Sequence, residues 1–137
     1  MAMTAADEIR DHQARCQPYM FRLRMLARGE AGSGPLAVQV GQATGAVIAE
    51  AEAASRAALA AGADGSHPGA GTFLRVRLDR LTAAAGEAIA AAQNDNLADL
   101  RLHLHRFEAL TSAIWAVQDS LYGQLPSIRP EPVPPPG

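Results

Sequence analysis

The fold of this chain is indicated most clearly by residues 94–121, NDNLADLRLHLHRFEALTSAIWAVQDSL. Asn96 followed three residues later by Asp99 is typical of a helix N-terminus, because the two side chains can bind backbone N–H groups that the first turn leaves unpaired. The apolar residues then recur at steps of three and four, as on one face of an α-helix. That face consists of Leu100, Leu104, Phe107, Leu110, Ile114, Val117 and Leu121, with Leu97, Leu102 and Trp115 at its sides. The pattern predicts a helix from about Leu97 to Tyr122.

Three further helices are predicted upstream of this segment, between glycine-rich connections. They run from about Thr4 to Arg28, from Pro35 to Ala61 and from Thr72 to Ala92. Pro18 lies inside the first of them, where it removes a backbone hydrogen bond and predicts a kink or a break. The longest connection, Gly62–Gly71, contains too many glycines to be predicted as regular structure.

The predicted second helix carries a stripe of small residues. Ser33 as a cap and Pro35 in the first turn predict where this helix starts. The stripe follows at four-residue spacing and consists of Gly41, Gly45, Ala49, Ala53 and Ala57. Small side chains let another helix approach closely. An alanine-rich helix in an alanine-rich chain is the alternative explanation of the same pattern.

Four helices of roughly 20 to 28 residues joined by short connections predict an all-α fold, an up-down-up-down four-helix bundle. The alternative is a pair of helical hairpins exchanged between the two chains of a dimer, which the glycine-rich central connection favours. We expect the bundle to occupy residues 1–123, with Gly123 and Pro126 ending the last helix. Residues 124–137 are rich in proline and are predicted to form a flexible, disordered tail.

The composition indicates the origin of the protein, its location and the partners that it is unlikely to bind. The chain of 137 residues has a net charge of −2, one cysteine and no lysine, and its many alanines with arginine as the basic residue are typical of a bacterial, GC-rich coding sequence. A chain without net positive charge makes nucleic acid an unlikely partner. The absence of an apolar leader predicts a cytoplasmic protein, and charges inside the alanine-rich stretches argue against a membrane span.

The arginines form two short clusters. They are Arg22, Arg24 and Arg28 near the end of the first predicted helix, and Arg75, Arg77 and Arg80 near the start of the third. In an up-down-up-down bundle these clusters lie at opposite ends, which predicts solvated charges. In an exchanged dimer they could converge on an anion or an acidic partner.

Four side chains are candidates for chemistry: His12, Cys16, His103 and His105. Such residues could ligate a metal or haem, or form a thiol–histidine pair. The sequence lacks the Glu-x-x-His motifs of di-metal bundles, and no third group is evident that would orient the pair on the first helix. We therefore expect no catalytic residues, metal or cofactor.

The wide apolar face of the last helix predicts more surface than one copy can bury, because large exposed apolar patches are uncommon in soluble monomers. The leading hypothesis is therefore a non-enzymatic interaction, scaffold or adaptor protein that self-associates and docks onto a larger protein assembly. Its expected interface consists of Leu97, Leu100, Leu104, Phe107, Ile114, Trp115, Gly41 and Gly45. The alternative is a bundle that binds a metal, haem or an apolar small molecule in its core.

Overall fold

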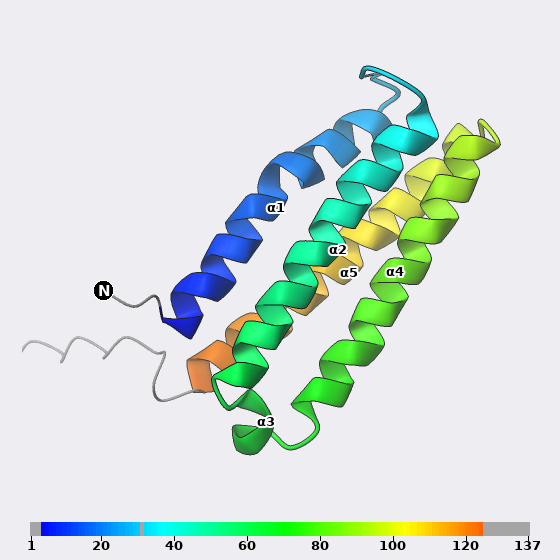
Figure 1. The fold of residues 1–137 in the computed structure, drawn as a ribbon. Coiled ribbons are helices and arrows are strands. Elements are labelled where there is room, and N and C mark those ends of the chain that lie inside the picture. The colour runs from blue at the N-terminus through cyan, green and yellow to red at the C-terminus, as the bar shows by residue number, and fades with distance from the viewer. Residues whose placement is uncertain (1–3, 31, 125–137) are drawn as a thin grey trace, which may run out of the picture.

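The computed structural model describes residues 4–30 and 32–124, and within these residues the regular structure is all α-helical. The helices are α1 (Ala5–Ala27), α2 (Leu36–Ala60), α3 (Ala63–Ser66), α4 (Ala70–Gln93) and α5 (Leu97–Gln124). Four of them are long and lie side by side, and consecutive long helices run in opposite directions (Figure 1). The predicted all-α class is confirmed, whereas the predicted tail lies outside the described residues.

Side chains cap two of the helices, and the cap at Asn96 is the one predicted from the sequence. At the start of α1, Thr4 accepts a hydrogen bond from the backbone N–H of Asp7, and the Asp7 carboxylate accepts one from the backbone N–H of Thr4. At the start of α5, the Asn96 side chain accepts a hydrogen bond of 3.1 Å from the backbone N–H of Asp99. Both motifs satisfy N–H groups that have no partner within the helix.

Several predicted boundaries are wrong for local backbone reasons. Ser33 does not cap α2, because Gly34 adopts a left-handed conformation at φ +94° and Pro35 becomes the residue that precedes the helix. The connection Gly62–Gly71 contains the one-turn helix α3, which Gly62 precedes at φ +97°. Gly123 lies inside α5 instead of ending it.

Pro18 bends α1 without breaking it. The helix continues from Ala5 to Ala27 with Pro18 inside it, so the predicted break is wrong. Figure 1 shows α1 changing direction about halfway along, as expected where a proline removes one helical hydrogen bond. Pro18 itself is exposed, so its ring does not disturb the core.

The four long helices pack in a rhomboid arrangement. Helix α1 lies against α2 and α5, and α4 also lies against α2 and α5, whereas α1 and α4 make no backbone contact within the described part of the chain. Across the centre α2 approaches α5 directly. The small residues Ala43, Ala51 and Ala54 on the buried side of α2 permit this approach. The buried residues of α4 recur at helical spacing and include Leu74, Leu78, Leu81, Ala85 and Ala88.

Candidate functional site

The single chain buries most of the apolar face of α5. Leu100, Leu104, Phe107 and Ile114 are each at most 4% exposed and belong to the central core. This corrects the expectation that α5 presents an open apolar face, because α1, α2 and α4 already cover these four side chains. Of the remaining predicted interface residues on this helix, Trp115 is half-buried against the core and Leu97 is 37% exposed.

The predicted stripe of small residues on α2 lies partly on the surface. A Cβ atom at Gly41 would lie 3.7 Å from Cδ1 of Ile89, so Gly41 faces α4. Gly45, one turn further along α2, is exposed and has nothing within 4 Å of a Cβ position, and the same holds for Gly86 on α4. Because α2 and α4 are antiparallel, these two glycines lie at about the same level. We call the surface formed by Gly41, Gln42, Gly45, Ala49, Thr82, Gly86, Ile89 and Ala90 the α2–α4 face.

The α2–α4 face carries no charge along its length. Residues 36–49 of α2 contain no charged side chain, and residues 81–93 of α4 contain only Glu87. Glu87 lies near α5, where its Oε2 is 3.1 Å from His103 Nδ1 and 3.5 Å from Arg106 Nη1. Towards α3 the face ends at Glu52 and Arg75, which form an ion pair between the two helices.

The four candidate ligands do not converge. His12 and Cys16 lie where α1 meets α2, while His103 faces Glu87 on α4 and His105 lies where α5 meets α1. His103 Nδ1 is close to Glu87 but is not aligned for a hydrogen bond. Within the described part of the chain, no three His, Cys, Asp or Glu side chains are grouped to hold a metal.

Cys16 is a buried core residue. Its side chain is fully covered, and its Sγ donates a long hydrogen bond of 3.9 Å to the Val47 carbonyl. Burial raises the pKa of the Cys16 thiol to about 11, and the nearby charge of Glu50 contributes to the increase. The thiol is therefore protonated at neutral pH and is a poor nucleophile.

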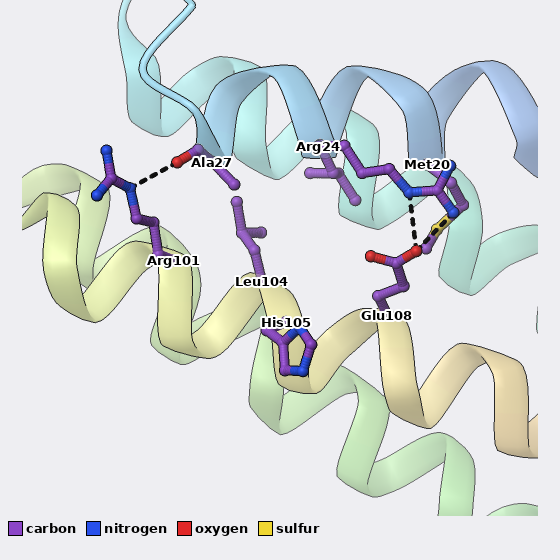
Figure 2. A pocket seen from close by; sticks show the side chains of 8 residues that line it. Met20, Arg24, Ala27, Arg101, Leu104, His105 and Glu108 are labelled. Carbon is purple, nitrogen blue, oxygen red and sulfur yellow. Dashed lines mark hydrogen bonds and ion pairs between the residues drawn. The ribbon is translucent and has the colours of Figure 1, made fainter.

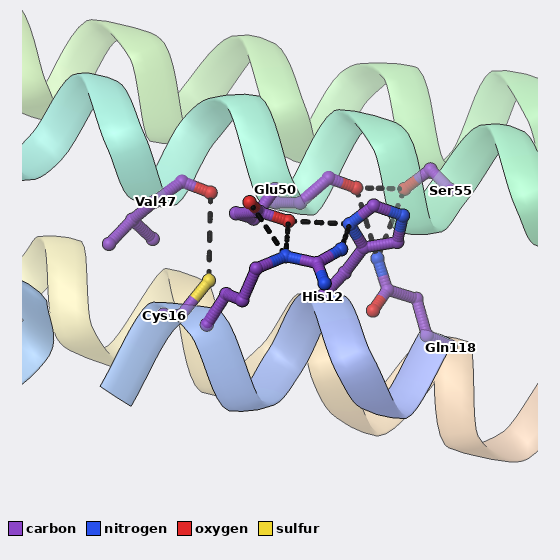
Figure 3. A network of polar contacts seen from close by, with 8 residues as sticks. His12, Cys16, Val47, Glu50, Ser55 and Gln118 are labelled. Atoms are coloured by element: carbon purple, nitrogen blue, oxygen red, sulfur yellow. Dashed lines mark hydrogen bonds and ion pairs between the residues drawn. The ribbon is translucent and has the colours of Figure 1, made fainter. Parts of the chain in front are cut away.

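His12 belongs to a cluster around Glu50 that joins α1 to α2 (Figure 3). Its Nδ1 lies 2.5 Å from Glu50 Oε2, and Arg15 Nε donates to both Glu50 oxygens at 3.1 and 3.2 Å. Partial burial favours a higher pKa for Glu50, but the hydrogen bonds from His12 and Arg15 outweigh it and lower that pKa below its ordinary value. The cluster is a structural link, because its hydrogen-bonding groups face one another.

Gln118 extends this polar region into the core. Its Nε2 donates to the Ala51 carbonyl at 3.2 Å and to Ser55 Oγ at 3.1 Å, which ties α5 to α2 (Figure 3). Its Oε1 accepts a hydrogen bond of 3.3 Å from Gln13 on α1. The network is satisfied by these three helices and leaves no unpaired group of Gln118 for a ligand.

A hollow of about 130 Å³ separates α1 from α5 (Figure 2). Its apolar lining includes Met20, Leu23 and Leu104, and His105 lies at its edge. Arg24 spans it and binds Glu108 with its Nη2 2.5 Å from Oε1, and this hydrogen bond raises the pKa of Arg24. Arg101 caps the end of α1 by donating a hydrogen bond of 2.7 Å to the Ala27 carbonyl. The polar groups that span this hollow are thus already paired.

A larger hollow of about 300 Å³ lies at the end of the molecule where the α1–α2 connection and the α4–α5 turn meet. We call it the loop-end hollow. It is lined by the apolar side chains of Leu26, Leu36 and Leu97, by the exposed acids Glu30 and Asp95, and by Gln39. No pattern in the sequence indicates this site, because its residues come from three helices and two connections.

Gln39 is the buried polar residue of this region. It is 4% exposed, its Nε2 donates to the Gly34 carbonyl at 2.8 Å, and its Oε1 has no hydrogen-bond partner among residues 4–30 and 32–124. Gly32 covers Oε1 closely, because a Cβ atom there would clash with it. A buried acceptor without a partner costs about 1 to 3 kcal/mol. Gln39 also lines a second hollow of about 240 Å³ beside Phe21 and Arg22.

The segments that carry the two arginine clusters, the C-terminal part of α1 and the N-terminal part of α4, lie at opposite ends of the long helices (Figure 1). Arg24 is paired with Glu108, and Arg75 is paired with Glu52 and Asp79. The Arg77 guanidinium lies over the Phe73 ring, 3.2 Å from its centre. The single chain therefore brings the clusters to no common surface.

Comparisons of the chain with known protein families, with curated proteins and with solved structures find no match. Across residues 4–30 and 32–124, none of the helices combines the length and the apolar character that crossing a membrane requires.

Proposed function

We propose that this chain is a non-enzymatic helical interaction protein, an up-down-up-down bundle that self-associates through the α2–α4 face. The observation that carries the proposal is the pair of exposed glycines in the middle of adjacent helices, Gly45 and Gly86. A glycine inside a helix costs roughly 0.5 to 1 kcal/mol relative to alanine. No close contact within the described part of the chain accounts for either glycine, whereas a second copy packed closely on this face would.

The absence of charge supports the same face. Long charged side chains would hold a second backbone at a distance, and the face between Gly41 and Ala49 has none. A symmetric dimer places the same patch of both copies in contact, so an uncharged patch meets itself without repulsion. Fourteen helical residues span about 21 Å, and two adjacent helices are about 20 Å wide, which gives a contact of roughly 400 Å² per copy. A stable interface needs about 800 Å² per copy, so we expect weak, reversible association.

The proposal assigns no catalytic or ligand-binding role to the four candidate residues, because they are buried, engaged by neighbours or far from one another. Cys16 is buried and protonated, and His12 is engaged by Glu50 and Arg15. His103 and His105 lie on different sides of α5. A metal held by several of these side chains would need them to meet, and within the described residues they do not.

Multi-angle light scattering over a range of concentrations tests the proposal. We expect the mean mass of the wild type to rise above the 14.3 kDa of one chain as its concentration increases into the hundred-micromolar range. Ala49→Arg should hold the protein at the mass of one chain, because it places a long charged side chain on the face, one helical turn from Gly45. Ala109→Arg is the matched control, since Ala109 is an exposed alanine on α5.

Three results would count against this proposal. One is a wild type that stays at one chain throughout, and another is an equal loss of association in both variants. The third is a dimer that Ala49→Arg does not dissociate, which would favour hairpins exchanged between chains because an exchanged dimer does not depend on this face.

A further inference from the structure

We infer that the loop-end hollow docks an arginine side chain of a partner protein. The inference rests on the proposed role as an interaction protein, and it concerns a surface separate from the α2–α4 face. It identifies the chemistry by which the protein would be recruited to a larger assembly.

The loop-end hollow carries two acidic side chains that have no basic partner in the described part of the chain. Glu30 and Asp95 both line the loop-end hollow, and neither forms an ion pair within the described residues. The acids between the helices are engaged instead, as Glu50, Glu87 and Glu108 illustrate. Among the described residues no basic side chain lines this hollow, and Arg22 lines the neighbouring one, which shares Glu30 with it. Two unpaired carboxylates at one site favour a cation.

The shape and polarity of the hollow suit a long side chain with a charged end. Leu26, Leu36 and Leu97 line the hollow with hydrocarbon from α1, α2 and α5. Arginine and lysine have apolar stems that lie along such surfaces while their charged ends remain near water. A volume of about 300 Å³ is at the lower limit for a small-molecule site, which suits one long side chain better than a whole ligand.

The geometry of the cation favours arginine over lysine. A guanidinium has five N–H donors in a planar fork, enough to serve both carboxylates, whereas an ammonium is a single point of charge. Gln39 is not counted among these partners, because its Oε1 lies under Gly32, which lines the neighbouring hollow together with Arg22.

The probe for this inference is the peptide acetyl-Leu-Arg-Leu-amide, titrated into the full ¹⁵N-labelled chain and followed by amide chemical shifts. Its control is the same peptide with citrulline, which keeps the shape of arginine and removes the charge. We expect saturable shifts at Gly29, Glu30, Asp95 and Leu97. The citrulline peptide should bind at least about tenfold more weakly, because it cannot pair with the carboxylates. Equal midpoints for the two peptides, or shifts centred on the α1–α5 hollow, would overturn the inference.

Variants separate this site from a general attraction between charges. Glu30→Gln with Asp95→Asn should weaken binding of the arginine peptide at least about fivefold, because both pairing partners are removed. Glu8→Gln with Asp11→Asn removes the same charge at the opposite end of α1 and should leave the midpoint unchanged. An equal loss of peptide affinity in both double variants would show a general attraction between charges and would contradict a specific site at the loop-end hollow. Repeating the titration in Ala49→Arg makes the result independent of self-association through the α2–α4 face.

Discussion

Helix α1 is held in different ways by its two neighbours. Against α2 it buries Cys16 completely and places His12 and Arg15 around the Glu50 carboxylate. Against α5 it leaves a hollow of about 130 Å³, spanned by the exposed pair of Arg24 and Glu108. The backbones of α1 and α5 are also in less extensive contact than those of α1 and α2.

This difference indicates where the fold opens first. Regions with few buried apolar contacts and exposed polar links open at lower free energy than close-packed ones. We expect α1 to remain on α2 while the α1–α5 contact fluctuates. The four predictions below test this comparison, in order of decreasing effect.

The largest expected effect comes from shortening one leucine of α5. Leu100 and Leu104 are 0% and 4% exposed, but only Leu104 lines the hollow beside α1. Replacing a buried leucine by alanine costs about 2 to 5 kcal/mol, and the cost rises with the volume of the cavity that remains. The loss of stability should lie near the upper end of this range for Leu100→Ala and near the lower end for Leu104→Ala. The space left by Leu104 merges with a hollow that is already open to solvent. Urea denaturation measures the free energy of unfolding of both variants. Equal decreases would show that the α1–α5 contact is as close-packed as the core.

A second prediction concerns Gln118, through which α1 and α5 are joined by a hydrogen bond from Gln13. Gln118→Ala should lower the free energy of unfolding by about 1 to 3 kcal/mol, because it removes hydrogen bonds to α2 and from Gln13. Gln118→Met is the control, since it keeps most of the volume without the hydrogen bonds. If the methionine variant is as stable as the wild type in thermal denaturation, packing and not the polar network holds this point.

The sequence predicts the helices better than it predicts the site, for reasons that particular residues illustrate. The cap at Asn96 and the apolar spacing of α5 depend on residues three to seven positions apart, and both were found from the sequence. The contact between His12 and Glu50 spans 38 positions, so it depends on the register between two helices. Periodicity specifies a face of each helix but not the residue that this face meets.

The interface predictions illustrate the same limit. The sequence cannot distinguish an apolar stripe buried by the rest of the chain, such as the one through Phe107, from one left for a partner. The exposure of Gly45 depends on the side of α2 against which α4 packs. The loop-end hollow combines Leu26, Leu36 and Leu97, which no local pattern connects.

The contact between α1 and α2 should depend on pH through Glu50. Its pKa is lowered below the ordinary value of 4.5 in the folded protein, so its contribution to stability is present above that value and is lost as the pH falls through the lower, folded pKa. Glu50→Gln should therefore destabilise the protein at pH 7, by about 1 kcal/mol or less because the site is partly exposed. Chemical denaturation should show that the difference in unfolding free energy between Glu50→Gln and the wild type becomes smaller below pH 4.5. Arg15→Gln should lower the stability by a similar amount at pH 7. A stability difference between Glu50→Gln and the wild type that grows towards acid pH would contradict the stabilising role of the Glu50 carboxylate.

The smallest effect is expected at the ion pair that spans the hollow between α1 and α5. Arg24 and Glu108 are 50% and 34% exposed, and pairs of this kind contribute about 0.2 to 1 kcal/mol. A double-mutant cycle with Arg24→Ala and Glu108→Ala should give a coupling energy in that range, and 1 M NaCl should reduce it because the screening length falls to about 3 Å. The longer and more exposed contact of Arg106 with Glu87 is the matched pair and should couple less. A coupling above about 2 kcal/mol that salt does not reduce would mean that this pair is a desolvated link, and that α1 is held as firmly by α5 as by α2.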